Sequence, residues 1–335
     1  MTKKHNMQEG AKSYMSNKES PLVSVIIPTY KRSDYLIRAL NSVLMQSYSN
    51  IEIVIVDDNN PGSEYRKKTK EKMNDYKGLA NIQYIENHKN LGGALARNEG
   101  IKAAQGEYVA FLDDDDIFLK DKIKHQMEFM LLNKLDLSFS NVAIVNEKGK
   151  IIDFREHSYL KSMDNSYLLK NHLMYHLTPT GTYIFDKKAL IKIGGFVPAA
   201  VGQEFRLMLK ALTENLKVGY FDETNLIQFV HSGERISVGQ NKIEGEKELL
   251  ELKKTYFNIL DKDEQKYVLF RYRAMLSFVG IRSKKPIFAA SNLVRAFAIS
   301  PKYFFKEMFG HGRKINMNRA KESLINDQIT NLYQA

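Results

Sequence analysis

The sequence predicts an α/β fold, in which a doubly wound and mainly parallel sheet is followed by a helical extension. Three observations predict it. Short apolar runs alternate with helical stretches over residues 22–116, polar or acidic residues directly follow three of these runs, and from about residue 243 the pattern is helical and basic. Strands separated by helices favour a parallel sheet with helices on both faces.

Four strands and three helices are expected in the first half. The strands are the apolar runs at 22–27, 51–56, 82–85 and 108–112. Between them, Ser33 or Asp34 is expected to cap a first helix, residues 64–77 to form a second, and residues 94–104 a third that begins after Gly92-Gly93.

Length and composition exclude several classes of protein. The 335 residues are enough for one large domain with an appendage. The chain has no cysteine, which excludes disulfides, thiolate metal sites and a cysteine nucleophile. Residues 1–20 are polar without a visible secretory signal, and no apolar window is long enough to cross a bilayer. We expect a flexible tail over 1–20 and a soluble or peripheral cytoplasmic protein.

The positive charge is concentrated near the C-terminus. Between Lys266 and Lys321, thirteen lysines and arginines and the single acid Glu307 give a net charge of +12, compared with +11 for the whole chain. Aromatic residues are interleaved with the basic ones. Amphipathic helices are expected, with one face formed by Leu249, Leu252, Tyr256 and Ile259 and another by Val268, Tyr272, Met275 and Val279.

Two interpretations fit this basic segment. It contacts an anionic membrane surface, or it forms a solvated basic face that covers the rest of the protein. Nucleic-acid binding ranks third and is not expected, because no nucleic-acid motif is present.

The polar groups at the strand ends are expected to form one crevice, since ligands of such sheets bind at the carboxyl ends of the strands. These groups are residues 29–32, Asp57-Asp58 and the run 113–116 of four aspartates. Adjacent carboxylates repel one another, and a divalent cation such as Mg²⁺ or Mn²⁺ relieves that repulsion. A solvated acidic loop is the alternative interpretation.

A bound magnesium ion usually completes its shell with substrate phosphates, so the acidic run points to a diphosphate ligand. The usual nucleotide motifs are missing: the sequence has no GxxxxGK[ST] loop and no GxGxxG. Their absence makes an NTPase or a dinucleotide-binding enzyme less favoured.

Four segments in this order resemble the GT-A-fold family-2 glycosyltransferases. They are 24–30 (SVIIPTY), 55–58 (IVDD), 90–98 (NLGGALARN) and 111–116 (FLDDDD), and the order and spacing match over about 22–237. The resemblance implies a Rossmann-like GT-A domain over 21–240, with a nucleotide half at 21–116 and an acceptor half at 117–240, followed by the basic helical extension at 241–335. It also implies an inverting transferase that requires Mn²⁺ or Mg²⁺.

The resemblance further implies a donor and an acceptor. The donor is a nucleotide diphosphate sugar, with a UDP-sugar favoured, and the acceptor is a glycan hydroxyl, lipid-linked in bacterial surface-polysaccharide synthesis at the inner face of the cell membrane. A protein acceptor is one alternative, and a non-catalytic protein that binds nucleotide sugars during assembly is another.

The resemblance assigns roles to the crevice residues. Asp57 is expected to accept a hydrogen bond from the base, Asp113 to contact the ribose and Asp115 to bind the metal, with Asp114 and Asp116 as alternatives if the register shifts by one. Lys31 stands where the family commonly has asparagine. The expected nucleotide-binding residues are Pro28, Thr29, Tyr30, Arg32, Asp57, Arg97, Asp113 and Asp114.

The acceptor side carries the expected catalytic base. Glu204, after Gly202-Gln203, occupies the position of the family's acidic pair but is one methylene longer than the usual aspartate; a helix-start glutamate is the alternative. Asp186 and Glu223 are the next candidates. His231 is expected to reach the metal or the diphosphate, or else to be an ordinary loop residue. Residues 178–182 either line the acceptor site or form a turn.

Overall fold

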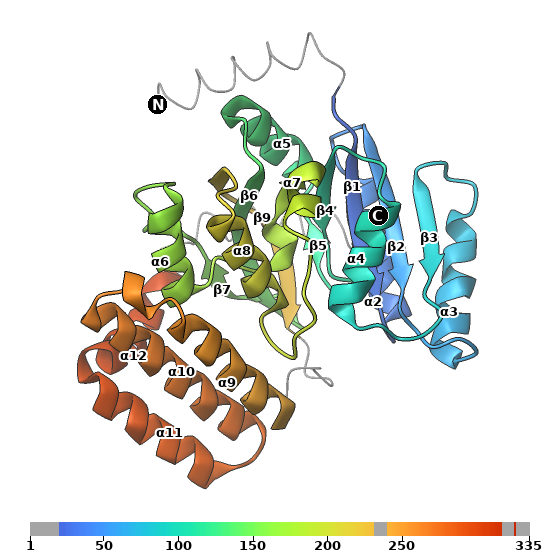
Figure 1. Ribbon diagram of the computed structural model, residues 1–335. Helices are drawn as coiled ribbons and strands as arrows, with labels where there is room; N and C mark the ends of the chain where they lie inside the picture. The colour runs from blue at the N-terminus through green and yellow to red at the C-terminus, as the bar shows by residue number, and fades with distance from the viewer. Residues whose placement is uncertain (1–19, 231–239, 317–324, 326–335) are drawn as a thin grey trace.

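The structure, a computed structural model, describes residues 20–230, 240–316 and 325 (Figure 1). Within them, nine strands form one sheet in the order β3-β2-β1-β4-β8-β6-β9-β5, and β7 pairs with β6 at its side. The strands are β1 (Val23–Thr29), β2 (Ile51–Asp57), β3 (Ile82–Glu86), β4 (Tyr108–Phe111), β5 (Ile117–Phe118), β6 (Leu137–Asn146), β7 (Ile151–Arg155), β8 (Ile184–Asp186) and β9 (Val218–Val230).

The sheet has a parallel part and a mixed part. β3, β2, β1 and β4 are mutually parallel, β8 is antiparallel to both β4 and β6, and β9 is again parallel to β6. Side chains alternate between the two faces along a strand. On β1, Ile26 therefore faces one buried cluster while Val25 and Ile27 face another. Helices cover both faces, as the predicted doubly wound sheet requires.

The helices of the sheet domain divide between these two clusters. α2 and α5 contribute to the cluster that contains Val25, and α4, α7 and α8 to the cluster that contains Ile26. Their bounds are α2 (Ser33–Leu44), α3 (Glu64–Met73), α4 (Gly93–Ala103), α5 (Lys122–Asn133), α6 (Asn165–Tyr175), α7 (Lys187–Lys192) and α8 (Gln203–Thr213).

The predicted strands and helices of the first half are confirmed to within a few residues, but the predicted cap of the first helix is wrong. α2 begins at Ser33 itself, with Arg32 in the capping position and no side-chain cap. Asp34 is the second residue of the helix, and its side chain pairs with Lys72 of α3 at 2.6 Å.

The extension consists of α9 (Gln240–Lys254), α10 (Lys262–Arg282), α11 (Pro286–Ile299) and α12 (Pro301–Asn316). It shares a buried cluster with α6 and α8 of the sheet domain, to which Phe205, Leu249 and Val268 contribute. No helix among the described residues is long and apolar enough to cross a membrane.

The predicted faces of these helices are partly wrong. Tyr256 and Ile259 lie beyond the end of α9, and Met275 is exposed although Val268 and Val279 are buried. α10 is covered on more than one side, by α9, α11 and α12, so its buried residues do not follow a single stripe.

Lys122 is a lysine whose side chain is buried inside the sheet domain. Its side chain has no exposed surface, Nζ donates to Oε1 of Gln126 at 2.6 Å, and the Phe118 ring centroid lies 4.8 Å away. Burial lowers the pKa of Lys122 to about 7, because the charged form loses its hydration.

Lys122→Met is expected to raise the free energy of unfolding at pH 7 and to flatten its pH dependence. The folded-state pKa lies below the value of about 10.4 for an unfolded lysine. Between these values the unfolded chain binds a proton that the folded chain does not, so wild-type stability falls as the pH decreases from about 10 to about 7. Removing the amine should add on the order of 2–4 kcal/mol at pH 7.

Urea unfolding at pH 7 and at pH 9.5 measures this effect. Lys124→Met, at an exposed position of the same helix, is the matched control and should leave both the stability and its pH slope unchanged. Identical pH slopes for wild type and Lys122→Met would show that the Lys122 amine is not the source of the pH dependence.

Candidate active site

The site lies where β1, β2 and β4 end. Thr29 on β1 is opposite Asp57 on β2, and Ile26 on β1 is opposite Phe111 on β4. These strands are parallel neighbours, so their carboxyl ends meet at one edge of the sheet. The three polar strand ends that the sequence singles out are therefore brought together.

Asp114 is buried beneath the loop after β1. Its carboxylate accepts hydrogen bonds from Oγ1 of Thr29 at 2.8 Å, the backbone N–H of Tyr30 at 3.3 Å and Nη1 of Arg32 at 3.3 Å. Burial, and then the charge of Asp115, raises the pKa of Asp114 to about 7, while Arg32 and Thr29 oppose the shift. Asp114 thus fixes the conformation of residues 29–32.

Asp116 is also buried, and it contacts the backbone of β9. Its carboxylate accepts from the backbone N–H of Phe229 at 3.1 Å, and burial together with the charges of Asp115 and Asp113 raises its pKa well above the usual value. Arg38 contacts both segments. Its guanidinium lies 3.8 Å from the centroid of the Phe229 ring and donates to the Asp115 carbonyl at 2.6 Å.

Asp113 and Asp115 are the two members of the run with accessible carboxylates. Their side chains are 34% and 16% exposed. Asp113 pairs with Arg97 of α4, and Asp115 pairs with Nη1 of Arg32 at 2.5 Å. Two arginines therefore neutralise the part of the run that is open to a ligand.

The donor chemistry of this pair fits Mg²⁺ or Mn²⁺, because both offer hard carboxylate oxygens. Over residues 20–230 and 240–316, no group of three or more histidines and carboxylates is arranged to hold a metal. His231, expected to contribute, lies outside the described residues. Asp113 and Asp115 are therefore the residues in the described part of the chain that would hold such an ion.

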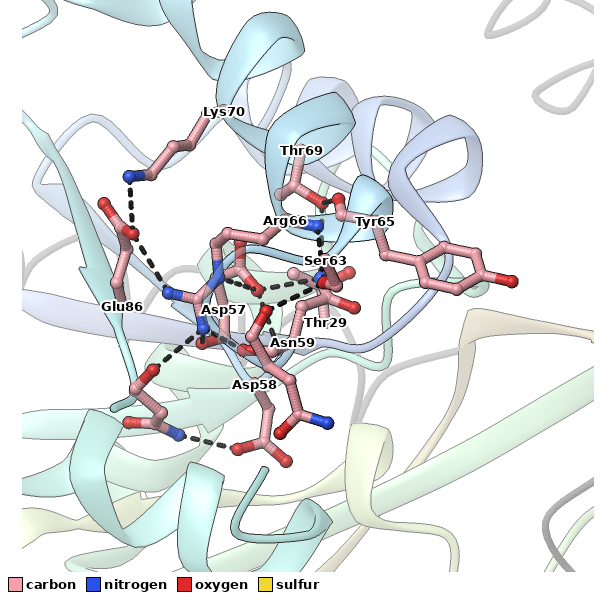
Figure 2. A network of polar contacts seen from close by, with 12 residues as sticks. Thr29, Asp57, Asp58, Asn59, Ser63, Tyr65, Arg66, Thr69, Lys70 and Glu86 are labelled. Carbon is pink, nitrogen blue, oxygen red and sulfur yellow. Dashed lines mark hydrogen bonds and ion pairs between the residues drawn. The ribbon is translucent and has the colours of Figure 1, made fainter. Parts of the chain in front are cut away.

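Asp57 lies in a buried polar network at the end of β2 (Figure 2). Its Oδ1 accepts from the backbone N–H and from Nδ2 of Asn59, at 2.9 and 2.8 Å, and Tyr84 donates to its Oδ2 at 2.5 Å. Burial, and then the hydrogen bond to Asp57, raises the pKa of Tyr84. The contact of Asp57 with a base stays a prediction, and the carboxylate already has these internal partners.

Arg66 of α3 holds this network together. Its Nε forms an ion pair with Asp57 at 3.1 Å and its Nη1 pairs with Glu86 at 3.0 Å, while its Nη2 donates to the carbonyls of Asp57 and Asn87 at 3.1 and 2.9 Å (Figure 2). The position of Arg66 in a charged helix is typical of a surface residue, so the sequence alone gives no signal for this buried role.

Asp58 shapes the loop that leads into α4. Its carboxylate accepts from Nδ2 of Asn87 and of Asn90 at 2.8 and 3.0 Å, and from the backbone N–H groups of Leu91 and Gly92, both at 2.8 Å. Gly92 has φ of +81°, a conformation that glycine adopts without strain. Asp58 therefore fixes the amino end of α4 at the crevice.

Arg97 links the acidic run to the start of α8. Besides its pair with Asp113, its Nη1 donates to Oε1 of Gln203 at 3.4 Å, and Gln203 is the first residue of α8. Glu204, the expected base, follows directly in the first turn of α8. The structure thus brings the acidic run and the expected base to the same region.

Phe205, next to Glu204, packs against α6 and against α9 of the extension. The His172 ring stacks on Phe205 with centroids 4.2 Å apart, and Nζ of Lys253 on α9 lies 5.1 Å from the same ring and 2.6 Å from Nε2 of His176. Leu177 N–H donates to Nδ1 of His172, so the His172 Nε2–H donates to the Phe205 carbonyl at 2.9 Å. Burial lowers the pKa of His172 to about 3, which keeps the ring neutral.

The other two candidates for the base lie elsewhere. Asp186 pairs with Tyr108 at the start of β4, the opposite end from the acidic run, and caps α7 through the Ala189 N–H at 2.9 Å. Glu223 contacts His125 at 3.1 Å and precedes Phe229 by six residues on β9, about 20 Å along a strand. Residues 178–182 include a buried 3₁₀ turn, Thr180–Thr182, as one of the two alternatives expected.

These features are those of the GT-A fold: the parallel half of the sheet ends in an acidic run, and helix α8 begins beside it. Residues 24–194 match the family described as Glycosyl transferase family 2, and the chain belongs to that family. The predicted class of transferase enzyme is confirmed at this level.

Several curated relatives share part of the chain. An uncharacterized glycosyltransferase of Rickettsia felis is 45% identical over 131 residues, which are 39% of this chain and 21% of that protein. The putative teichuronic acid biosynthesis glycosyltransferase TuaG of Bacillus subtilis is 38% identical over 47% of this chain and 61% of its own. The β-1,3-glucosyltransferase WfgD of Escherichia coli, named for UDP-Glc and α-D-GlcNAc-diphosphoundecaprenol, is 32% identical over 43% of this chain and 56% of its own.

Two solved structures share the fold. S. aureus TarS 1–349 in complex with UDP-GlcNAc has a TM-score of 0.56 at 19% identity and covers 83% of this chain and 91% of that one. The mannosyltransferase PcManGT of Pyrobaculum calidifontis, in complex with GDP-Man and Mn²⁺, has a TM-score of 0.54 at 14% identity and covers 98% of this chain and 92% of its own.

Proposed function

We propose that this chain is an inverting, metal-dependent glycosyltransferase that moves a sugar from a nucleotide diphosphate donor, a UDP-sugar in the first instance, to a hydroxyl of a glycan acceptor. The acceptor is proposed to be lipid-linked, with the enzyme working in the cytoplasm at the inner face of the membrane. Support comes from family membership, from relatives named for teichuronic acid and for a diphosphoundecaprenol acceptor, and from neighbours solved with UDP-GlcNAc or with GDP-Man and Mn²⁺.

The observation that carries the proposal is the pair of contacts made by Arg97. It joins Asp113, at the end of the nucleotide half of the sheet, to Gln203, beside the expected base. A donor bound at the strand ends then has its reacting carbon near Glu204. This arrangement matches the proposed division at about residue 116 into a nucleotide half and an acceptor half of the domain 21–240.

The proposed roles follow from the contacts. Residues 28–32 and Arg97 bind the nucleotide and its phosphates, with Asp57 and Asp113 toward base and ribose. Asp113 and Asp115 would hold Mn²⁺ or Mg²⁺, which offsets the charge of a departing diphosphate. Glu204 takes the proton of the acceptor hydroxyl as that oxygen attacks the anomeric carbon from the side opposite the diphosphate, which inverts the configuration.

Turnover tests the proposal directly. Purified protein, Mn²⁺ and a panel of nucleotide sugars are first screened by thermal shift, since a ligand that binds the folded state raises the melting temperature. The donor that stabilises is then incubated with a GlcNAc-diphosphate-lipid acceptor. Free nucleoside diphosphate should appear together with the glycosylated acceptor in equal amounts. Donor binding without release of diphosphate, across a panel that includes glycan and protein acceptors, would instead support a non-catalytic binding protein.

A further inference from the structure

α10 and α11 form one layer on the outside of the molecule. Figure 1 shows α11 at the outer edge of the C-terminal helices, away from the sheet. Gly280 of α10 allows the close approach, because a Cβ there would lie 2.9 Å from Ala289 of α11. Oγ of Ser277 also donates to the Ala289 carbonyl at 3.0 Å. The two helices are therefore closely packed at this point.

These two helices carry the most exposed large apolar side chains of the described chain. Ile287 is 86% exposed, Val294 67%, and Phe278 and Ile281 each 62%. Phe278 and Ile281 are three residues apart on α10, and Ile287 and Val294 are seven apart on α11, so each pair shares a helix face. Ile281 and Ile287 lie on either side of the turn that joins the two helices, and exposed apolar side chains that gather at one place mark an interaction site.

The same segment is basic throughout. From residue 265 to residue 306 the chain has nine lysines and arginines and no acid. Lys285 and Arg295 form no ion pair within the part of the chain that the structure describes, and with Arg273 they line a groove of about 760 Å³ whose apolar wall includes Ile287 and Phe288. The groove therefore combines apolar and cationic side chains.

We infer that the turn that joins α10 to α11, with the exposed Ile281 and Ile287 beside Arg282, Lys284 and Lys285, docks on an anionic lipid bilayer. The apolar side chains enter the acyl boundary and the cations meet lipid phosphates, as in interfacial helices. A second copy of the chain would oppose like charges across the same face. The exposed aliphatic side chains have no counterpart on a nucleic acid. Docking itself does not depend on the proposed function. Its purpose does, because docking would bring the enzyme to a lipid-linked acceptor.

Vesicle flotation without donor or acceptor tests the surface, so its outcome is independent of sugar transfer. Wild type should bind phosphatidylcholine vesicles that contain phosphatidylglycerol, should not bind pure phosphatidylcholine, and should detach as salt is added. Arg282→Gln, Lys284→Gln and Lys285→Gln combined should weaken binding roughly 100-fold, at about fivefold per charge.

Matched variants separate this surface from general effects. Lys68→Gln, Lys77→Gln and Lys188→Gln combined remove the same charge from exposed positions of the sheet domain and should leave most of the binding. Ile287→Ser should weaken binding at every salt concentration. Ile191→Ser, which alters a 57% exposed side chain on α7, should not.

Three results would overturn the inference. In the first, wild type binds neither kind of vesicle. In the second, the triple-glutamine variant of the docking surface and Ile287→Ser both bind as wild type does. In the third, the chain is a dimer in solution that Ile287→Ser dissociates, which would assign the face to a second copy.

Discussion

Glu204→Gln is expected to lower the rate of sugar transfer by roughly 10²–10⁴-fold, the usual contribution of a general base. Glutamine keeps the size and the hydrogen-bonding shape of the side chain but does not accept the acceptor proton. That loss acts on the transition state and little on the bound donor. The affinity for the nucleotide sugar, measured by calorimetry, should therefore stay within about twofold of wild type.

Glu204→Asp is the matched variant, because it keeps the carboxylate and restores the residue usual in the family. It should retain more activity than the glutamine variant if the shorter side chain still reaches the acceptor. Transfer by Glu204→Gln at the wild-type rate would remove Glu204 from the mechanism. Asp186 and Glu223 would not replace it readily, since one lies at the far end of β4 and the other beside His125.

The parallel half of the sheet and its crevice could be predicted because the signals are local. A polar residue that directly follows an apolar run marks a strand end, and parallel pairing brings such ends together. For this reason the sequence alone predicts that Thr29, Asp57 and the acidic run lie at one edge of the sheet. The mixed half is less predictable, since β8 has only three residues and its pairing with β4 and β6 is decided by the whole chain.

Which aspartates of the acidic run are buried and which are accessible could not be predicted from the sequence. Four identical residues in a row give no local reason for two of them to be buried. Thr29, 85 residues away, donates to the buried Asp114, and the backbone of Phe229, 113 residues away, donates to the buried Asp116. The contact between Arg97 and Gln203 spans 106 residues. Such partners are set by tertiary structure, which sequence spacing does not encode.

The difference in exposure among the four aspartates leads to a prediction about metal-dependent UDP binding. Because Asp113 and Asp115 have the accessible carboxylates, Asp115→Asn is expected to abolish the effect of Mn²⁺ on UDP binding while the protein stays folded. In wild type, UDP should bind roughly 5–150-fold more tightly with Mn²⁺ than with EDTA, the usual range for coupling between two ligands. Titration calorimetry measures both affinities. By linkage, UDP should tighten Mn²⁺ binding by the same factor.

Two variants control for charge and for register. Asp75→Asn changes the net charge equally at an exposed position outside the site and should keep the full effect of Mn²⁺. Asp113→Asn should weaken UDP binding both with and without the metal, since Asp113 is proposed to contact the ribose as well. If Asp115→Asn keeps the metal effect and Asp113→Asn alone removes it, the metal contact belongs to Asp113. Equal affinity of wild type for UDP with Mn²⁺ and with EDTA would contradict a metal-dependent donor site, because a cation bound between the aspartates and the diphosphate necessarily couples the two ligands.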